Sequence, residues 1–190
     1  MRSLAPRVVA PSLADVDINA LKAEGIRGLV LDLDNTITSW RSLEVSDDIL
    51  AWLDRARAAG LELCIISNSS KFQRVAELSE RLRMPASARP GLKPFGPGFR
   101  RGLEILGTPP EATAAIGDQI FSDVLGGNRS GLYTVFVAPM SRSEFVATKV
   151  VRIVERVALW LLRRRGMFPE SAAVGSPAAG QSQAQEERQA

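Results

Sequence analysis

The sequence predicts an α/β protein with a three-layer α/β/α, Rossmann-like fold, in which helices cover both faces of a parallel sheet. The first observation is a set of apolar runs of strand length, at residues 28–33, 61–66, 113–116 and 132–137. Second, these runs are continuously apolar, which is typical of strands buried on both faces. Third, helical patterns separate them, as crossovers between parallel strands require. A chain of 190 residues with 45% apolar composition suits one such domain.

The helices are predicted from their ends and their periodicity. Ser46 is a typical N-cap before the acidic Asp47 and Asp48, and Gly60 suits the end of the helix that they begin. Pro97 suits an early position in a later helix. Further helices are expected over residues 70–82 and 97–106 and from residue 121 onward.

Four segments organise the chain. Residues 1–27 are expected to form an N-terminal extension with a short helix, and residues 28–141 the catalytic core. Residues 142–165 hold 7 of the 24 basic residues but only 2 of the 21 acidic ones, and predict a basic amphipathic helix. Residues 166–190, rich in Ala, Gly, Ser, Gln and Pro, are expected to be disordered.

The basic helix has two interpretations. Its exposed face would carry Lys149, Arg152, Arg156 and Arg163 with Trp160 beside them. Such a face is either solvated while the apolar side packs on the sheet, or attaches the protein to an anionic membrane surface. Both can hold together.

Composition excludes several classes of function. The chain contains no histidine, which rules out His-dependent serine and cysteine hydrolases and HExxH zinc sites. Its one cysteine, Cys64, lies in an apolar stretch and indicates a reducing compartment. Because no segment has the length of a signal peptide or of a membrane span, we expect a cytoplasmic protein, or one peripheral at the inner face of a membrane.

Acidic and polar side chains stand where the predicted strands end. Asp32 and Asp34 close the first run, Ser67 the second, and Asp118 the third. Because ligands of parallel α/β sheets bind beyond the carboxyl ends of the strands, these residues are expected to converge. Several carboxylates at close range repel one another unless a cation joins them. A site with oxygen ligands and without His or Cys indicates Mg²⁺.

The pattern resembles the haloacid dehalogenase (HAD) superfamily of phosphatases over roughly residues 29–131. Four motifs match in order, namely DxDxT, a hydroxyl residue after the second strand, a lysine, and GDxxxxD. The residues that carry them are Asp32, Asp34, Thr36, Ser67, Lys93, Gly117, Asp118 and Asp123.

The chemistry expected of these residues is phosphoryl transfer. Asp32 is the expected nucleophile that forms an aspartyl phosphate, and Asp34 would protonate the leaving oxygen and then activate water. Mg²⁺ would be held by Asp32, Asp118 and the main-chain carbonyl of Asp34. The remaining candidates are phosphate ligands or supporting residues. The phosphate ligands are Thr36, Ser67, Asn68 and Lys93, and the supporting residues are Asp123 and Arg129.

Within the superfamily, the chain is similar to the capless subfamily IIIA, and there to the YqeG-type group that includes phosphatidylglycerophosphate phosphatases. The similar segments are LKAEGIRGLVLDLDNTIT, SNSS, GLKP and GDQIFSDVLGGNRSGLYTVFV. The resemblance implies no large cap domain, an open site, and removal of the terminal phosphate of phosphatidylglycerophosphate.

Three alternatives stay open at this point. The protein could be a soluble HAD phosphatase for small sugar or nucleotide phosphates. It could instead be a phosphorylation-controlled binding module, as receiver domains are, with a stable aspartyl phosphate and no useful turnover. A nucleic-acid partner for the basic helix is disfavoured, because the rest of the chain is close to neutral.

Overall fold

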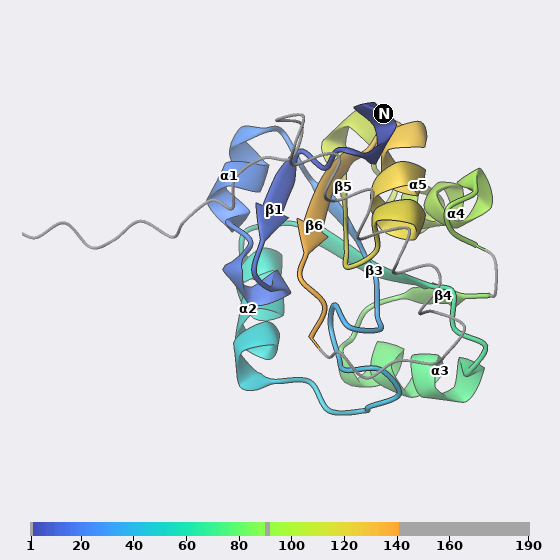
Figure 1. Cartoon of the computed structure of the whole chain (residues 1–190). Helices are drawn as coiled ribbons and strands as arrows, with labels where there is room; N and C mark the ends of the chain where they lie inside the picture. Colours follow the sequence, from blue (N-terminus) through green and yellow to red (C-terminus); the bar gives the residue numbers. More distant parts are fainter. Residues whose placement is uncertain (1, 90–91, 141–190) are drawn as a thin grey trace, which may run out of the picture.

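The structure is a computed structural model that describes residues 2–89 and 92–140. Six strands form one parallel sheet in the order β1-β6-β5-β2-β3-β4 (Figure 1). The strands are β1 (Val8–Ala10), β2 (Gly28–Leu31), β3 (Glu62–Ser67), β4 (Ala86–Ala88), β5 (Thr113–Gly117) and β6 (Tyr133–Val137). The predicted α/β class and parallel sheet are confirmed.

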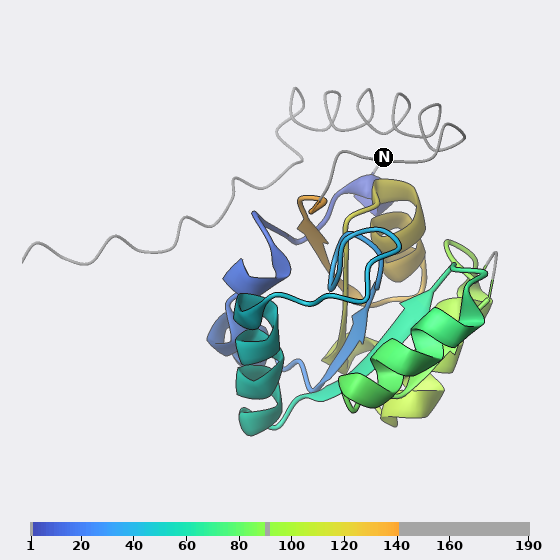
Figure 2. The same cartoon turned by 90° about the horizontal axis from the view of Figure 1, so that it is seen from below.

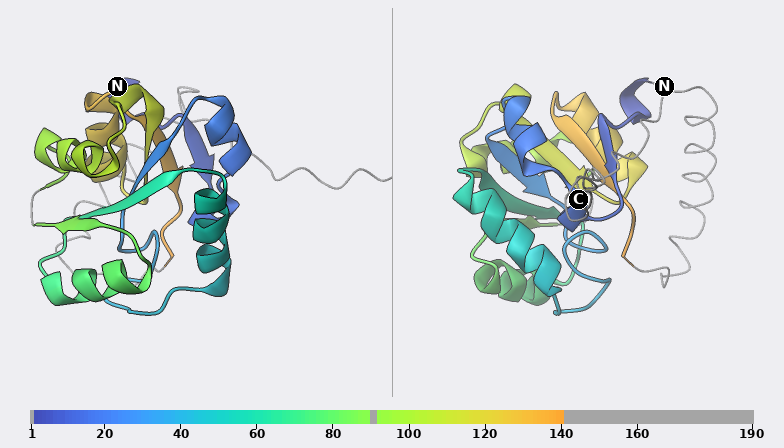
Figure 3. Two further views of the ribbon diagram at one scale, coloured as in Figure 1. Left: turned by 180° about the vertical axis from the view of Figure 1, so that it is seen from behind. Right: turned by 90° about the vertical axis from the view of Figure 1, so that its left-hand side faces the viewer.

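Helices cover both faces of the sheet (Figure 3). The α-helices are α1 (Ile18–Ala23), α2 (Asp47–Ala58), α3 (Phe72–Arg81), α4 (Gly96–Leu106) and α5 (Leu125–Arg129). Short 3₁₀ turns are η1 (Arg2–Leu4), η2 (Leu13–Asp15) and η3 (Pro110–Ala112), and η4 (Ile120–Val124) is a π-helical turn.

The two faces of the sheet follow from the alternation of side chains along each strand. Leu29 and Leu31 of β2 belong to a core cluster with buried residues of α1, α2 and α3. Val30 of β2 and Cys64 of β3 point to the other face and belong to a cluster with α4. Burial raises the pKa of the Cys64 thiol to about 12, so this cysteine is a buried apolar residue, as expected.

The helices pack closely on the sheet where small residues allow it. A Cβ atom on Gly102 of α4 would lie 2.8 Å from Cγ2 of Val30, closer than packed carbon atoms approach. The glycine therefore lets α4 lie directly against β2, the strand that ends at the site.

The N-terminal segment differs from the expected extension. β1 pairs in parallel with β6 at the edge of the sheet, from Val8 opposite Val135 to Ala10 opposite Val137. Leu13 and Leu21 are buried in the main core cluster. The indole Nε1 of Trp52 in α2 donates a hydrogen bond of 2.7 Å to the carbonyl of Val16. The described residues before 28 thus belong to the folded core.

The predicted elements agree with the structure to within a few residues, with three differences. β2 ends at Leu31, so Leu33 lies in the loop after it. β1 and β4 are short edge strands of three residues, too short to show a periodic pattern. The helix expected from residue 121 begins with the π-helical turn η4, and α5 continues it.

The described residues hold no inserted domain and no membrane-spanning helix. In residues 2–89 and 92–140 no domain-sized segment is inserted between the elements of the sheet, as expected for a capless protein. In this described part, no helix is both long and apolar enough to cross a bilayer. The expected basic helix and tail lie outside the described residues, with Lys149, Arg152, Arg156 and Arg163, and both stay predictions.

Candidate active site

Three strand ends meet at the carboxyl edge of the sheet. β2 lies between β3 and β5, and the chain leaves β2 toward β3 but later returns to its other side through β5. A crevice opens at such a reversal of strand order. Asp32 directly follows β2, and its N–H donates a hydrogen bond of 2.9 Å to the carbonyl of Ile116 in β5. Ser67 ends β3, and Asp118 directly follows β5.

A buried ion network joins residues from three separate segments. The ammonium group of Lys93 donates to Oδ1 of Asp32 and, at 2.6 Å, to Oδ1 of Asp123. The three residues are at most 7% exposed. Charges buried to this degree are stable only when they are paired. The network therefore fixes the end of β2, the segment before α4 and the turn η4 relative to one another.

The electrostatics of this network are set by burial and by neighbouring charges. Burial raises the pKa of Asp32 to about 7; the Lys93 ammonium opposes this effect, and Asp123 and Asp34 add to it. Burial alone would lower the pKa of Lys93, but the carboxylates of Asp123 and Asp32 raise it above its usual value. The two carboxylates therefore favour the charged form of Lys93, and further positive charge beside Asp32 would favour its ionised form.

Gly117 lets Asp123 reach this network. A Cβ atom at Gly117 would lie 2.3 Å from Cγ of Asp123, so any side chain at this position would displace the carboxyl group. The other oxygen of Asp123, Oδ2, accepts a hydrogen bond of 3.1 Å from the backbone of Gln119. The π-helical turn η4 thus directs the second acid of GDxxxxD back toward β5.

The carboxylates fit a divalent cation. One carboxylate oxygen from each of Asp32, Asp118 and Asp123 lies within 4.8 Å of the other two, and all three residues are buried. Among the described residues, Oδ2 of Asp32 is buried without a hydrogen-bond partner. Buried oxygen atoms of this kind suit Mg²⁺, which prefers carboxylate ligands. Both oxygens of Asp123 already accept hydrogen bonds, whereas Oδ2 of Asp32 accepts none, so Asp32 is the better ligand of these two residues.

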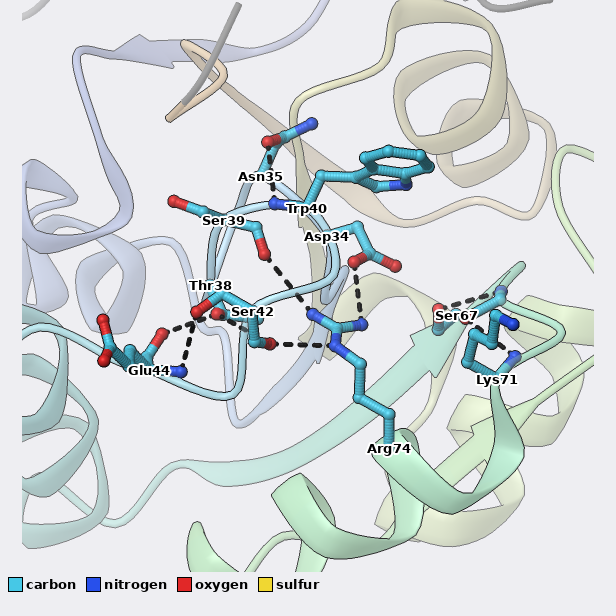
Figure 4. A network of polar contacts seen from close by, with 11 residues as sticks. Asp34, Asn35, Thr38, Ser39, Trp40, Ser42, Glu44, Ser67, Lys71 and Arg74 are labelled. Atoms are coloured by element: carbon cyan, nitrogen blue, oxygen red, sulfur yellow. Dashed lines mark hydrogen bonds and ion pairs between the residues drawn. The ribbon is translucent and has the colours of Figure 1, made fainter. Parts of the chain in front are cut away.

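Asp34 lies apart from the carboxylate cluster. Its Oδ1 forms an ion pair of 2.8 Å with Nη1 of Arg74 in α3, and its side chain lines the open pocket (Figure 4). The structure thus gives the two acids of DxD different partners, a lysine for Asp32 and an arginine for Asp34. The side chain of Asp34 is not in the metal cluster, so the predicted ligand role concerns its main-chain carbonyl alone.

The loop after β2 is tightly folded. Asn35 has a positive φ of 62°, and its N–H donates a hydrogen bond of 2.7 Å to the carbonyl of Thr38. The side chain of Asn35 accepts a bond of 3.3 Å from the N–H of Trp40. In Figure 2 this loop, drawn in blue, lies between α2 and α3. Asn35 therefore shapes the loop that presents Asp34.

The expected phosphate ligands take different positions. Ser67 is buried and lines the pocket, and its hydroxyl accepts a bond of 3.1 Å from the N–H of Ser69. The side-chain amide of Asn68 forms two hydrogen bonds with the backbone of Lys93. It accepts one from the N–H at 2.9 Å and donates one to the carbonyl at 3.0 Å. Asn68 thus holds the lysine in place. Thr36 is buried, and its hydroxyl has no hydrogen-bond partner among the described residues.

Arg129 lies away from this group. It is an exposed residue at the end of α5, the helix that carries the chain from the carboxyl end of β5 back to the start of β6. Gly131, two residues later, packs near Pro110, which shortly precedes β5. Gly131 and Pro110 both lie near the amino ends of the strands, whereas the candidate site lies at their carboxyl ends. The structure therefore does not bring Arg129 to the candidate site.

The pocket has a basic rim that the sequence motifs do not mark. A pocket of about 270 Å³ is lined by Asp32, Asp34, Ser67 and Asn68 and also by Trp40, Arg41, Lys71, Arg74 and Gln119. The Arg41 guanidinium lies 4.2 Å from the centre of the Trp40 ring. Gln119 stands inside GDxxxxD, next to Asp118, whereas the other four residues belong to no short motif. Only their closeness in sequence to Asp34 and to Ser67 could have pointed to these four.

Two family models match the chain on either side of the lysine segment. Residues 1–87 match the model described as mitochondrial PGP phosphatase, where PGP stands for phosphatidylglycerophosphate, and residues 92–143 match a HAD-hydrolase-like model. A solved structure of an uncharacterized protein from Listeria monocytogenes covers 73% of this chain and 99% of its own, with a TM-score of 0.52 and 17% identity. That likeness supports the fold.

Two named relatives define the group. The probable phosphatase YqeG of Bacillus subtilis is 35% identical over 77% of this chain and 84% of its own length. Phosphatidylglycerophosphate phosphatase 1 of Arabidopsis thaliana is 29% identical over 86% of this chain, which spans only 49% of that protein. The chain therefore belongs to the HAD superfamily, in its YqeG and phosphatidylglycerophosphate phosphatase group. The predicted enzyme class, a HAD-type phosphatase, is confirmed with it.

The Asn68 contacts with Lys93 generate a first prediction. Replacing Asn68 with Ala removes two hydrogen bonds and should lower the free energy of unfolding by about 1–3 kcal/mol. Because Lys93 loses its anchor, the KM for 4-nitrophenyl phosphate should also rise several-fold. Urea denaturation and steady-state kinetics measure the two effects.

Asn128→Ala provides the matched control. The Asn128 amide bonds the carbonyls of Ser3 and Ala5 and the hydroxyl of Thr134, and it lies in α5 away from the pocket. This variant should lose stability without a change in KM. An unchanged KM in Asn68→Ala would contradict the anchoring role.

Proposed function

We propose that this protein is a Mg²⁺-dependent phosphomonoesterase that forms an aspartyl phosphate on Asp32 and removes the terminal phosphate of phosphatidylglycerophosphate. The observation that carries the proposal is the separation of the two acids of DxD. Asp32 is buried against Lys93 beside Asp118, whereas Asp34 lies outside this cluster and lines the pocket. This separation supports attack on phosphorus by Asp32 and proton transfer by Asp34.

In the first half-reaction, a carboxylate oxygen of Asp32 attacks the phosphorus atom of the ester. The bond between phosphorus and the leaving oxygen breaks, and protonated Asp34 gives its proton to that oxygen. Lys93 and Ser67 would contact the other phosphate oxygens; the bond from Lys93 to Asp32 and the position of Ser67 at the end of the neighbouring strand support these roles. The alcohol leaves, and an aspartyl phosphate stays on Asp32.

In the second half-reaction, Asp34 acts as a base. It removes a proton from a water molecule whose oxygen attacks the phosphorus atom of the aspartyl phosphate. Inorganic phosphate leaves, Asp32 regains its carboxylate, and Asp34 regains its proton. This second step distinguishes an enzyme from a phosphorylation-controlled module, in which the aspartyl phosphate would persist.

Mg²⁺ would be held by Asp32 and Asp118, with the main-chain carbonyl of Asp34 as a further ligand. When bound, it supplies positive charge that neutralises the phosphate and favours the ionised form of Asp32. Asp123 would keep Lys93 and the turn η4 in place, as its two hydrogen bonds suggest.

The substrate assignment rests on the relatives and on the shape of the site. The matching plant protein is named a phosphatidylglycerophosphate phosphatase. This lipid has a terminal phosphate monoester and, one glycerol away, a phosphodiester. A pocket without a cap can reach a phosphate on a bilayer surface. Exposed Lys71 and Arg41 at its rim suit the second phosphate and neighbouring anionic headgroups.

Two exposed aromatic side chains that are close in sequence to residues of the site support contact with lipid. Phe72, next to Lys71, is 55% exposed, and Phe95, two residues after Lys93, is 65% exposed. Aromatic rings beside basic groups are typical of surfaces that lie on a bilayer. We therefore propose that the protein works as a peripheral protein at a membrane, with the predicted basic segment as a second contact.

The nucleophile role of Asp32 leads to a second prediction. Asp32→Asn removes the attacking carboxylate but keeps its size, so turnover of every phosphate ester should be lost. The fold should be retained, because Lys93 still pairs with Asp123. Circular dichroism and thermal unfolding check that the fold is retained, and phosphate release measures turnover. Retained activity in a folded variant would exclude Asp32 as the nucleophile.

Metal binding leads to a third prediction, which does not depend on activity. Mg²⁺ should raise the midpoint of thermal unfolding, with a stabilisation of about 2.7 kcal/mol at 100 times its Kd. Asp118→Asn should abolish this shift. Asp54→Asn, which changes an exposed carboxylate paired with Arg57, should keep it. An equal shift in all three proteins would show that Asp118 is not a ligand.

The identity of the substrate is tested with a panel of phosphate esters at a fixed Mg²⁺ concentration. It contains phosphatidylglycerophosphate in detergent micelles and in vesicles, glycerol 3-phosphate, glucose 6-phosphate and AMP. We expect kcat/KM for the lipid to exceed the others by at least ~10-fold, which is about 1.4 kcal/mol of transition-state binding. A sugar phosphate or nucleotide as the best substrate would favour the soluble alternative. A single burst of phosphate without turnover would favour the binding module.

A further inference from the structure

Arg74 joins helix α3 to the loop that carries Asp34. Its Nη1 forms the 2.8 Å ion pair with Oδ1 of Asp34, and its Nε donates a bond of 2.8 Å to the carbonyl of Ser42. Its Nη2 donates a weaker bond of 3.4 Å to the carbonyl of Ser39. Figure 4 shows the guanidinium between these groups, with Asp34 on one side and the loop backbone on the other. Three nitrogen atoms thus hold three points of one loop.

The contacts are well sheltered from solvent. The Arg74 side chain is 11% exposed and that of Asp34 20%. A guanidinium donates in several fixed directions, so it can bind a carboxylate and two carbonyls at once, which an ammonium group cannot do with the same geometry. The arrangement therefore fixes an orientation and does more than balance charge.

The tight loop fixes the backbone of Asp34 but does not by itself fix its carboxyl group. β2 ends at Leu31, so Asp34 lies outside the strand, and the strand alternation that would place it on the same side as Asp32 no longer applies. Asp34 lies instead in the loop whose next residue, Asn35, has a positive φ. A contact from outside the loop is needed to hold the carboxyl group at a set distance from Asp32, and Arg74 provides it.

We propose that Arg74 is the positioning residue for the acid and base of this enzyme. It holds Oδ1 of Asp34 and leaves Oδ2 to exchange the proton with the leaving oxygen and then with water. The inference rests on the proposed role of Asp34 in proton transfer. Arg74 itself neither attacks phosphorus nor transfers a proton.

The effect of a misplaced Asp34 on the rate depends on the leaving group of the substrate. An alkyl ester such as phosphatidylglycerophosphate releases a strongly basic oxygen, which must take the proton of Asp34 as its bond to phosphorus breaks. An aryl ester such as 4-nitrophenyl phosphate releases a stable phenolate, which needs no proton. Hydrolysis of the aspartyl phosphate, in which Asp34 acts as a base, is common to both esters and affects kcat for both. In kcat/KM, which reports the steps up to formation of the aspartyl phosphate, a misplaced Asp34 therefore slows the alkyl ester and spares the aryl ester. Loss of folded protein or weaker phosphate binding would slow both equally.

The test compares kcat/KM on these two esters in Arg74→Gln, Arg74→Lys and Asp34→Asn. Arg74→Gln should reduce kcat/KM for the alkyl ester by ~10–100-fold, the cost of a small misplacement, while kcat/KM for the aryl ester changes only a few-fold. Arg74→Lys keeps the charge and should recover part of the alkyl rate. In the Asp34→Asn background, Arg74→Gln should have no further effect on the alkyl ester, because the group that it positions is already absent.

Arg81→Gln is the matched control. Arg81 also extends from α3 to the same loop, with a bond of 2.8 Å from Nη1 to the carbonyl of Leu43, but no contact joins it to Asp34 in the described structure. This variant should keep the ratio of alkyl to aryl rates. Equal losses on both esters in Arg74→Gln, with Asp34→Asn still selective for the alkyl ester, would overturn the role of Arg74 alone. If Asp34→Asn affected both esters equally, the proposed role of Asp34 would fail as well.

Discussion

The site depends on one buried interaction, the pairing of the Lys93 ammonium with the carboxylates of Asp32 and Asp123. None of these charges could be buried alone, since an unpaired ion in the interior costs several kcal/mol. The sheet and the turn η4 must therefore be in place before any of them is stable. The end of β2, the segment before α4 and the turn after β5 come together as one unit, and the remaining parts of the site are arranged around it.

Two acids that are two residues apart acquire different properties from this arrangement. Asp32 lies in the buried network, where burial raises its pKa to about 7 and a cation beside it favours the ionised form. Asp34 lies in a partly exposed loop and pairs with Arg74, which also holds the loop backbone. In a chain without histidine, the mechanism that we propose uses this division, with Asp32 as the buried nucleophile and Asp34 as the proton carrier.

The open edge of the sheet suits a substrate that is larger than the pocket. In the described part of the chain, short loops rather than a cap domain surround the pocket, and its rim carries Arg41 and Lys71. The exposed Phe72 and Phe95 lie next to residues of the site in the sequence. These groups support our proposal that the site acts on a phosphate at the surface of a bilayer.

The sequence by itself determined the fold class, the main strands of the sheet and the acidic and basic residues at their ends. These features follow from local patterns, since continuous apolar runs predict buried parallel strands and strand ends predict where ligands bind. Only the tertiary structure decided which side chains meet. In the structure β1 pairs with β6, and the side chain of Asn68 bonds the backbone of Lys93. Asp34 forms an ion pair with Arg74, and Arg129 lies near the amino ends of the strands, away from the site. The physical reason is that such contacts join residues far apart in the chain, and their geometry depends on packing that no local period or motif encodes.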